Sequence, residues 1–202
     1  MLNIYNFIES TKTLGPFNRF ALWTQGCSFS CSGCMTPDSQ SLNNGVKISV
    51  LNIAQTILNT PNIEGITISG GEPFLQAGEL KNLINAVRKK RDFGVIVYTG
   101  YTLEQLKEKN DSKINLLLES IDILIDGLFD ESLNDGVSLR GSSNQNVYQF
   151  TPKYAKVFHD YYGRDVREIE MHMNSEHMMI VGIPKNNTLH EINNLHQSEG
   201  KI

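Results

Sequence analysis

The sequence predicts an α/β fold whose mostly parallel β-sheet forms a partial or full barrel. Two observations carry this prediction. Short apolar or β-branched segments alternate with segments whose apolar residues recur at helical spacing, and unusual residues follow the strand-like segments at their ends. Such an order gives parallel strands joined by right-handed crossovers. Because active sites in these folds lie at the carboxyl ends of the strands, the same order indicates where a site should form.

Four segments have the composition of buried strands. The first, Arg19–Thr24, runs directly into a loop that contains cysteines. The next three are Glu64–Ser69, Gly94–Thr99 and Ser120–Asp126. His177–Ile183 is expected to form a last strand, which Pro184 stops.

Helical patterns separate these strands. In Gln76–Arg91 the apolar residues form one stripe, and basic residues lie at the end, where the helix dipole favours them. The other helices are expected over Ser49–Asn59, Leu103–Lys109, Lys113–Glu119 and Pro152–Tyr162.

Two segments lack a regular pattern. Gly127–Phe150 is rich in Gly, Ser and Asn, and a loop of that length in a compact domain is usually functional or mobile. From Lys185 onward the sequence is polar. We therefore expect one domain over residues 1–184 and a polar tail over residues 185–202.

Composition excludes several classes of protein. The 202 residues suffice for one domain with a hydrophobic core. With a net charge of −4, the chain lacks the excess of basic residues that is typical of nucleic-acid-binding proteins. No apolar run approaches the roughly 18 residues of a membrane span, and the N-terminus lacks the pattern of a signal peptide. We expect a cytoplasmic protein with neither a nucleic-acid nor a membrane partner.

All three cysteines lie within eight positions, as Cys27, Cys31 and Cys34. An odd, clustered set is a poor disulfide framework, whereas in a reducing compartment such a set more often binds a metal. Iron–sulfur clusters usually take four thiolates, so three would leave one iron open to another ligand. Small residues such as Gly33 let the backbone curl around a cluster and offer it amide donors. We expect a redox enzyme.

A structural zinc is the alternative at this point. It would use the three cysteines and a distant histidine, for which His159, His172 and His177 are available. Structural zinc sites usually contain paired C-x2-C units, which the C-x3-C-x2-C spacing does not match. This alternative predicts a scaffold without catalytic turnover.

A second motif, Ser69-Gly70-Gly71-Glu72-Pro73, follows the second predicted strand. With the cysteine loop before it, the sequence resembles the radical S-adenosylmethionine (SAM) family, whose cluster and GGEP motifs occur in this order. Over residues 13 to 146 it is also similar to the activating component of anaerobic (class III) ribonucleotide reductase. The segments that carry this second resemblance are Gly15-Pro16, Gln25–Cys27, Ser32–Cys34, Tyr98–Leu103, Asp122–Gly127 with Phe129, and Leu139–Gln145.

The resemblance implies a partial (incomplete) β/α barrel of the radical SAM type, with one [4Fe-4S] cluster and SAM as cofactors. It implies that the cluster, reduced by flavodoxin or ferredoxin, cleaves SAM to methionine and a 5′-deoxyadenosyl radical. In glycyl-radical-enzyme activases this radical removes hydrogen from a glycine of a large glycyl-radical enzyme, here an anaerobic ribonucleotide reductase. A radical SAM enzyme that modifies another peptide or a small molecule remains an alternative.

The resemblance also assigns roles. Cys27, Cys31 and Cys34 would hold the cluster and be catalytic. Gly33 and Ser69-Gly70-Gly71-Glu72-Pro73 would bind cofactor, since the two central glycines present no Cβ to SAM. Glu72 would either bind the SAM ammonium with its backbone or order the loop.

Three further roles remain open. Thr99 and Asp126, at strand ends, could contact SAM or a cation, while Asp126 could instead be a cap or turn residue. Arg140–Gln145 could bind SAM, dock the partner or form a solvated loop. Trp23 is expected in the core, and Met171, Met173, Met178 and Met179 are expected as filler in the core or at an interface.

Overall fold

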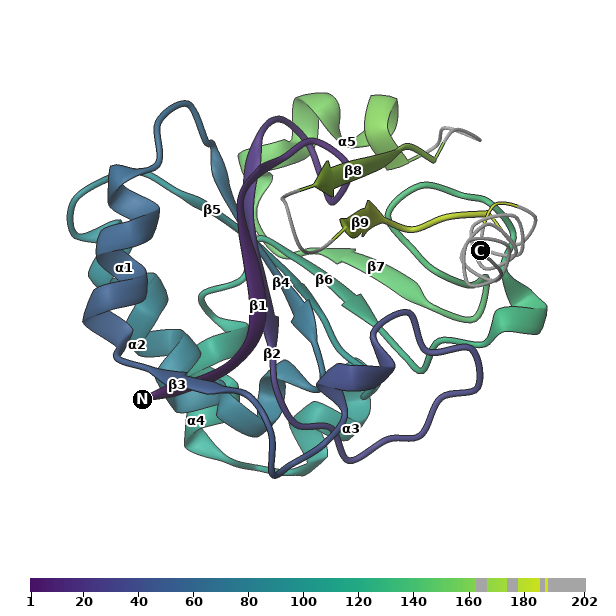
Figure 1. The fold of residues 1–202 in the computed structure, drawn as a ribbon, viewed down its shortest axis with the longest axis horizontal. Helices are drawn as coiled ribbons and strands as arrows, with labels where there is room; N and C mark the ends of the chain where they lie inside the picture. The colour runs from purple at the N-terminus through teal and green to yellow at the C-terminus, as the bar shows by residue number, and fades with distance from the viewer. Residues whose placement is uncertain (163–166, 174–177, 186–187, 189–202) are drawn as a thin grey trace, which may run out of the picture.

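A computed structural model describes residues 1–162, 167–173, 178–185 and 188. Seven strands form one sheet in the order β3-β1-β2-β4-β5-β6-β7, and β8 and β9 form a separate hairpin (Figure 1). The strands are β1 (Leu2–Thr11), β2 (Arg19–Thr24), β3 (Val46–Ile48), β4 (Gly65–Gly70), β5 (Gly94–Tyr98), β6 (Ile123–Asp126), β7 (Asn146–Gln149), β8 (Ile169–Met173) and β9 (Met178–Gly182).

The centre of the sheet is parallel and both of its sides are antiparallel. Strands β2, β4, β5 and β6 pair in parallel, while β1 runs antiparallel to β2, β3 to β1, and β7 to β6. The predicted mostly parallel α/β fold is confirmed. The alternative of a full barrel is wrong, because β3 and β7 lie at opposite ends of the strand order and do not pair with each other.

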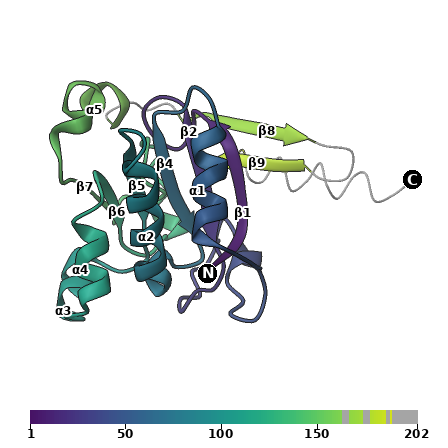
Figure 2. The same cartoon turned by 90° about the vertical axis from the view of Figure 1, so that its left-hand side faces the viewer.

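Helices α1 (Val50–Asn59), α2 (Ala77–Arg88), α3 (Leu103–Glu108) and α4 (Ser112–Leu118) cover one face of the sheet (Figure 2). Helix α5 (Ala155–Tyr162) packs on the other face, where Val157 and Phe158 join a cluster with Ile96, Ile123 and Ile125. Side-chain caps fix the starts of three of the helices: Ser49 accepts from the amide of Asn52, Asp111 accepts from that of Lys113, and Thr102 forms a capping box. Among the described residues, no helix is both long and apolar enough to cross a bilayer.

Strand β2 shows how the two faces of the sheet differ. Phe20 and Leu22 belong to the main core beneath the helices, whereas Ala21 and Trp23 pack in a second cluster with Val181 of β9. This alternation follows from the two-residue period of a strand. The face away from α1 to α4 therefore carries the β8–β9 hairpin as well as α5.

Four strands were not expected from the sequence: β1, β3, β7 and β8. Strand β7 lies within Gly127–Phe150, so the prediction that this whole segment is a loop is wrong. The strand predicted over Ser120–Asp126 begins only at Ile123. The last predicted strand exists as β9, but it pairs with β8 instead of joining the main sheet, and His177 lies outside the described residues. Most of the predicted tail also lies outside them.

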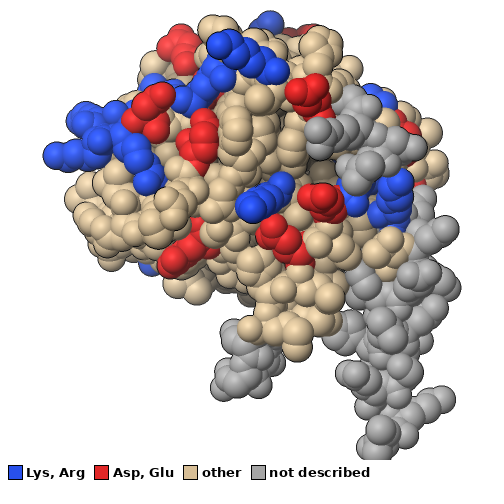
Figure 3. Space-filling model, turned by 90° about the horizontal axis from the view of Figure 1, so that it is seen from above, with Lys and Arg blue, Asp and Glu red and all other residues tan. Residues whose placement is uncertain are grey.

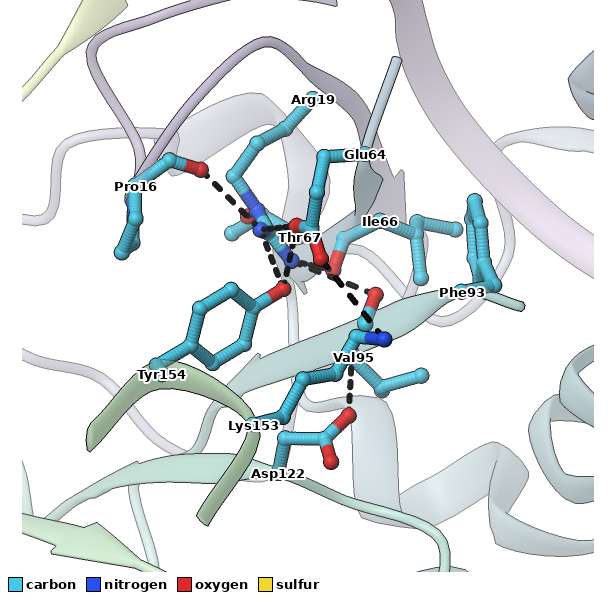
Figure 4. Close-up of polar contacts among 12 residues, drawn as sticks. Pro16, Arg19, Glu64, Ile66, Thr67, Phe93, Val95, Asp122, Lys153 and Tyr154 are labelled. Carbon is cyan, nitrogen blue, oxygen red and sulfur yellow. Dashed lines mark hydrogen bonds and ion pairs between the residues drawn. The ribbon is translucent and has the colours of Figure 1, made fainter. Parts of the chain in front are cut away.

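The amino ends of the parallel strands are closed by a buried arginine (Figure 4). The Arg19 side chain is fully buried and donates to Glu64 Oε2 at 2.9 Å, Thr67 Oγ1 at 2.7 Å and the Tyr154 hydroxyl at 2.7 Å. It also donates to three carbonyl oxygens, those of Pro16, Ile66 and Gly94. The segment that leads into α5 is thereby fastened to β2 and β4. Figure 3, which looks onto this end, shows basic and acidic side chains interspersed.

We expect Arg19→Met to lower the free energy of unfolding by about 3–5 kcal/mol, because Glu64 and several buried acceptors lose their donor. Urea unfolding followed by circular dichroism measures the loss. Lys153→Met is the matched control, since Lys153 pairs with the exposed Asp92 and should cost less than about 1 kcal/mol. Equal losses in the two variants would contradict the role of Arg19.

Candidate active site

A cavity of about 600 Å³ opens at the carboxyl ends of the four parallel strands. The loops after β2, β4 and β5 line it, as the sequence pattern predicts. Eight of the predicted site residues lie in its wall: Cys27, Cys31, Cys34, Ser69, Gly70, Gly71, Glu72 and Thr99. Gly33, Pro73 and Asp126 do not line it.

The cysteine loop leaves β2 and is held at its base by backbone hydrogen bonds. The amide of Gly26 donates to Ser39 O at 2.8 Å, and that of Cys27 donates to Gln40 O at 3.0 Å. Further along, the Cys34 amide donates to Cys31 O at 3.3 Å, across Gly33 with its positive φ of 70°. All three cysteines are half-buried free thiols on one short, curled segment.

The surroundings of the thiols disfavour isolated thiolates. Burial raises the pKa of both Cys27 and Cys31, and the nearby Glu72 carboxylate adds to the rise. Backbone amides work in the opposite direction, since Phe29 donates to Cys27 Sγ at 3.4 Å and Phe129 donates to Cys31. Thiolates in such a place need a cation or an iron–sulfur cluster as a partner.

Glu72 ties two of the loops together. Its buried carboxylate accepts from the Phe74 amide at 2.9 Å, the Thr99 hydroxyl at 2.9 Å and the Gly100 amide at 2.8 Å. Of the two roles open for Glu72, these bonds favour ordering of the loop. The Thr99 hydroxyl is committed to the same network. Burial raises the pKa of Glu72 to about 7, although the three donors oppose the rise.

This raised pKa predicts a pH dependence of stability in the metal-free protein. The Glu72 carboxyl binds its proton more tightly in the folded protein than in the unfolded chain. Its contribution to the free energy of unfolding is therefore complete below the unfolded-state pKa of 4.5 and is lost as the pH rises through the folded-state pKa of about 7. Glu72→Gln should abolish that decline, which amounts to roughly 3 kcal/mol. Urea unfolding of both proteins between pH 5 and pH 8, under reducing conditions, measures it. Parallel curves for the two proteins would contradict the prediction.

Gly71 is required by close packing of the backbone. A Cβ there would lie 2.2 Å from Gly26 O and 2.8 Å from Ser39 O. Hydrogen bonds from Gly71 N to Thr24 O and from Glu72 N to Gly26 O, both 2.8 Å, hold the strands this close. At Gly70 a Cβ would likewise meet the backbone of Thr24, at 2.4 Å. Packing within the protein therefore already requires glycine at both positions, whether or not a cofactor also contacts them.

Sequence reasoning missed an aromatic contact that fixes the far side of the cysteine loop. Phe29 packs edge-on against Tyr101, with ring centroids 4.7 Å apart. The Lys109 ammonium lies over the Tyr101 ring, with Nζ 4.3 Å from the ring centroid. Phe29 occurs in the cysteine loop after β2, and Tyr101 occurs in the loop after β5. Because both residues follow the carboxyl ends of parallel strands, the sequence could have placed them near each other.

Asp126 is buried and fully engaged outside the cavity. Its Oδ2 accepts from the Leu103 amide at 2.7 Å, at the start of α3, and its Oδ1 accepts from the amide and side chain of Asn146. These bonds favour the cap role over the cofactor role, and a cofactor contact stays a prediction.

Part of the cavity wall comes from residues expected to be core or interface filler. Met178, Met179 and Ile180 of β9 line the cavity, as do Trp23 and Tyr98 of the sheet. The C-terminal hairpin thus contributes an apolar wall. Its contribution was not apparent in the sequence, because the hairpin reaches the site only through tertiary packing.

The histidines of the zinc alternative lie elsewhere. His172 contacts Glu170 at 3.2 Å, and neither His159 nor His172 lines the cavity. Within the described residues, no group of three or more His, Cys, Asp or Glu side chains is arranged to hold a single metal ion. A cluster, unlike a single zinc ion, spreads its thiolate ligands over several irons.

Comparison with known proteins identifies the family. Residues 13–148 match the family described as "4Fe-4S single cluster domain". The anaerobic ribonucleoside-triphosphate reductase-activating proteins of Pasteurella multocida and Escherichia coli K12 are 31% and 30% identical to the chain. They align over 74% and 73% of it, and over 99% and 98% of their own lengths. The chain belongs to this family of activating proteins.

The same protein of Vibrio cholerae is 29% identical, over 74% of the chain and 99% of its own length. The match to a single-cluster 4Fe-4S domain agrees with the three-cysteine loop, which lies within the matched residues. The family match ends at residue 148, so α5 and the β8–β9 hairpin lie beyond it. One wall of the cavity is therefore built by a segment outside the family match.

Proposed function

We propose that the chain activates an anaerobic ribonucleotide reductase, by using a [4Fe-4S] cluster and SAM to form a glycyl radical on it. One observation carries the proposal: the three cysteines and the Ser69–Glu72 loop, far apart in sequence, line the same cavity at the carboxyl ends of the parallel strands. The names and the near-complete coverage of the relatives support the same function.

In this proposal Cys27, Cys31 and Cys34 hold the cluster through three of its irons. When bound, the cluster and SAM supply the one-electron cleavage and the hydrogen abstraction that the protein alone lacks. The chain's own residues position these groups: amides of Phe29 and Phe129 donate to thiol sulfurs, which favours the deprotonated ligand.

The rest of the cavity is assigned to SAM. Ser69, Gly70 and Gly71 present backbone at its floor, and Glu72 holds that loop against Gly100. Trp23, Met178 and Met179 form an apolar wall that excludes water from a reactive organic group. A binding role for Gly33, Pro73, Thr99 and Asp126 would then be indirect, through the loops that they help to shape.

The partner is proposed to be the large reductase that carries the glycine, with flavodoxin or ferredoxin as the electron donor. A cytoplasmic location belongs to the same proposal, because three free thiols and an oxygen-sensitive cluster suit a reducing compartment.

Anaerobic reconstitution tests the proposal. The protein with iron, sulfide, a strong reductant and SAM should produce 5′-deoxyadenosine, and added anaerobic ribonucleotide reductase should acquire a glycyl-radical signal in electron paramagnetic resonance. A reductase variant without the radical-bearing glycine is the control. SAM cleavage without any radical on the reductase would favour another substrate, and a colourless zinc protein without cleavage would favour a scaffold.

A further inference from the structure

Arg167 lies outside the family match, just before β8, yet it reaches the wall of the cavity. Only 3% of its side chain is exposed. The side chain is directed at the 134–145 loop, which we define as residues 134–145 between the short 3-10 helix Glu131–Leu133 and β7. An arginine buried this deeply needs acceptors for all of its donors.

Every N–H group of the Arg167 guanidinium has a partner. Nε donates to Val137 O at 2.9 Å. Nη1 donates to Asn134 Oδ1 at 2.6 Å and to Pro184 O at 3.4 Å. Nη2 donates to Arg140 O at 2.5 Å and to Gly141 O at 3.1 Å. Four of these five bonds end on the 134–145 loop and the fifth ends just after β9, so the side chain fastens two walls of the cavity to each other.

The backbone of the loop is strained and needs such support. Leu139 has a φ of +70°, in the left-handed region that a leucine seldom adopts, and it is buried. Its carbonyl accepts from the Tyr98 hydroxyl at 2.7 Å, and the neighbouring Ser138 hydroxyl donates to Tyr161 O. A strained conformation persists only where its surroundings over-determine it. Arg167 donates to the carbonyls of Val137 and Arg140, which lie on either side of Ser138 and Leu139.

The loop in turn touches the candidate cluster site. Gly141 and Gln145 line the cavity. Gln145 accepts from the Gly141 amide at 2.7 Å and donates to Gly127 O at 2.7 Å, which orders the segment leading to Phe129. The Phe129 ring packs against Gly141, and its amide donates to the Cys31 thiol. A continuous set of contacts therefore runs from Arg167 to Cys31.

We propose that Arg167 is a positioning residue. The five hydrogen bonds of its guanidinium hold the 134–145 loop against the end of β9, and this fixes the part of the cavity wall that contacts the Cys31 segment. The planar fork is essential to this role, because a lysine ammonium offers three donors at one point and cannot reach acceptors spread over five residues. The effect on loop order is independent of the proposed function, whereas the effect on SAM affinity rests on it.

Arg167→Lys tests the proposal. In the metal-free protein, amide hydrogen exchange of residues 134–145 should accelerate at least about tenfold, while exchange in α1 and α2 stays unchanged. After anaerobic reconstitution, the variant should keep its iron content but bind radiolabelled SAM about tenfold more weakly in equilibrium dialysis. Arg88→Lys is the matched control, since Arg88 pairs with Asp122 away from the cavity and should leave both readouts unchanged.

Unchanged exchange in the 134–145 loop would overturn the inference. Acceleration spread equally over α1 and α2 would also overturn it, because Arg167 would then serve global stability alone. If Arg167→Lys does not fold, Asn134→Ala removes the side-chain acceptor of the same guanidinium and should also accelerate exchange in the loop, whereas unchanged exchange would overturn the inference. Failure of the unaltered protein to bind SAM would count against the proposed function, and the exchange result would still decide the role of Arg167.

Discussion

Replacing Cys31 with alanine is expected to remove the iron–sulfur cluster and, with it, the cleavage of SAM. The chain has three cysteines, and within the described residues no histidine lines the cavity to replace a lost thiolate. Loss of groups that merely orient ligands typically costs 10- to 100-fold, so loss of a ligand should cost at least about 100-fold. Iron content, charge-transfer absorbance and 5′-deoxyadenosine yield, measured anaerobically, report the effect.

Cys27→Ala and Cys34→Ala should behave in the same way, because each removes one of three ligands. Ser30→Ala is the matched control: Ser30 lies in the same loop, is exposed and does not line the cavity. It should retain iron and activity. A cysteine variant that cleaves SAM at the normal rate would remove that cysteine from the proposed ligand set.

The second large effect is expected for Gly71→Ala, although it adds a single methyl group. The added Cβ would lie 2.2 Å from Gly26 O and 2.6 Å from Gly26 C, which are backbone atoms that no rotamer change can move away. Since Cys27 follows Gly26, the base of the cysteine loop must shift. We expect reconstituted iron content to fall and SAM cleavage to drop at least about 100-fold.

Gly78→Ala is the control, because the same substitution at this position should stabilise the protein instead of disrupting it. Gly78 lies in α2, where the atoms nearest to an added Cβ belong to the flexible Lys113 side chain, at 3.3 Å and beyond. This variant should keep full iron content and gain up to about 1 kcal/mol of stability, because alanine favours a helix and the exposed lysine side chain can move aside. Normal iron content and activity in Gly71→Ala would show that the cysteine loop tolerates displacement, contrary to the packing argument.

The parallel core was predictable because its strands are short runs rich in apolar and β-branched residues. Arg19–Thr24 is a strand over the predicted residues, and the rule that sites lie at carboxyl ends brought Cys27, Ser69 and Thr99 to one cavity. Local pattern alone suffices where a strand is buried on both faces.

Local pattern fails at the margins of the fold. Strand β1 alternates regularly over Leu2, Asn3 and Ile4, but Asn6 falls where the next buried apolar residue is due, and the register shifts between Ile4 and Asn6. Strand β8 carries Glu170 and His172 and pairs only with β9. Such strands are specified by tertiary neighbours, which a window of sequence does not contain.

In the candidate site, too, some residues were predictable from local sequence and others were not. Cysteine spacing and the Ser69–Pro73 motif identify the residues that carry chemistry. The residues that hold them act through backbone atoms: Gly71 through contact with Gly26, and Arg167 through four carbonyl oxygens. A carbonyl acceptor is present at every position of a chain, so its use leaves no trace in residue identity.

Trp23 is the single tryptophan of the chain, and its nearly buried ring lines the cavity. Indole emission is therefore a built-in optical reporter located at the place where chemistry is proposed. Iron–sulfur clusters absorb broadly where indole emits, so assembly of the cluster should dim the fluorescence by energy transfer. The protein can thus be followed from empty to loaded in a sealed cuvette, without any label or added probe.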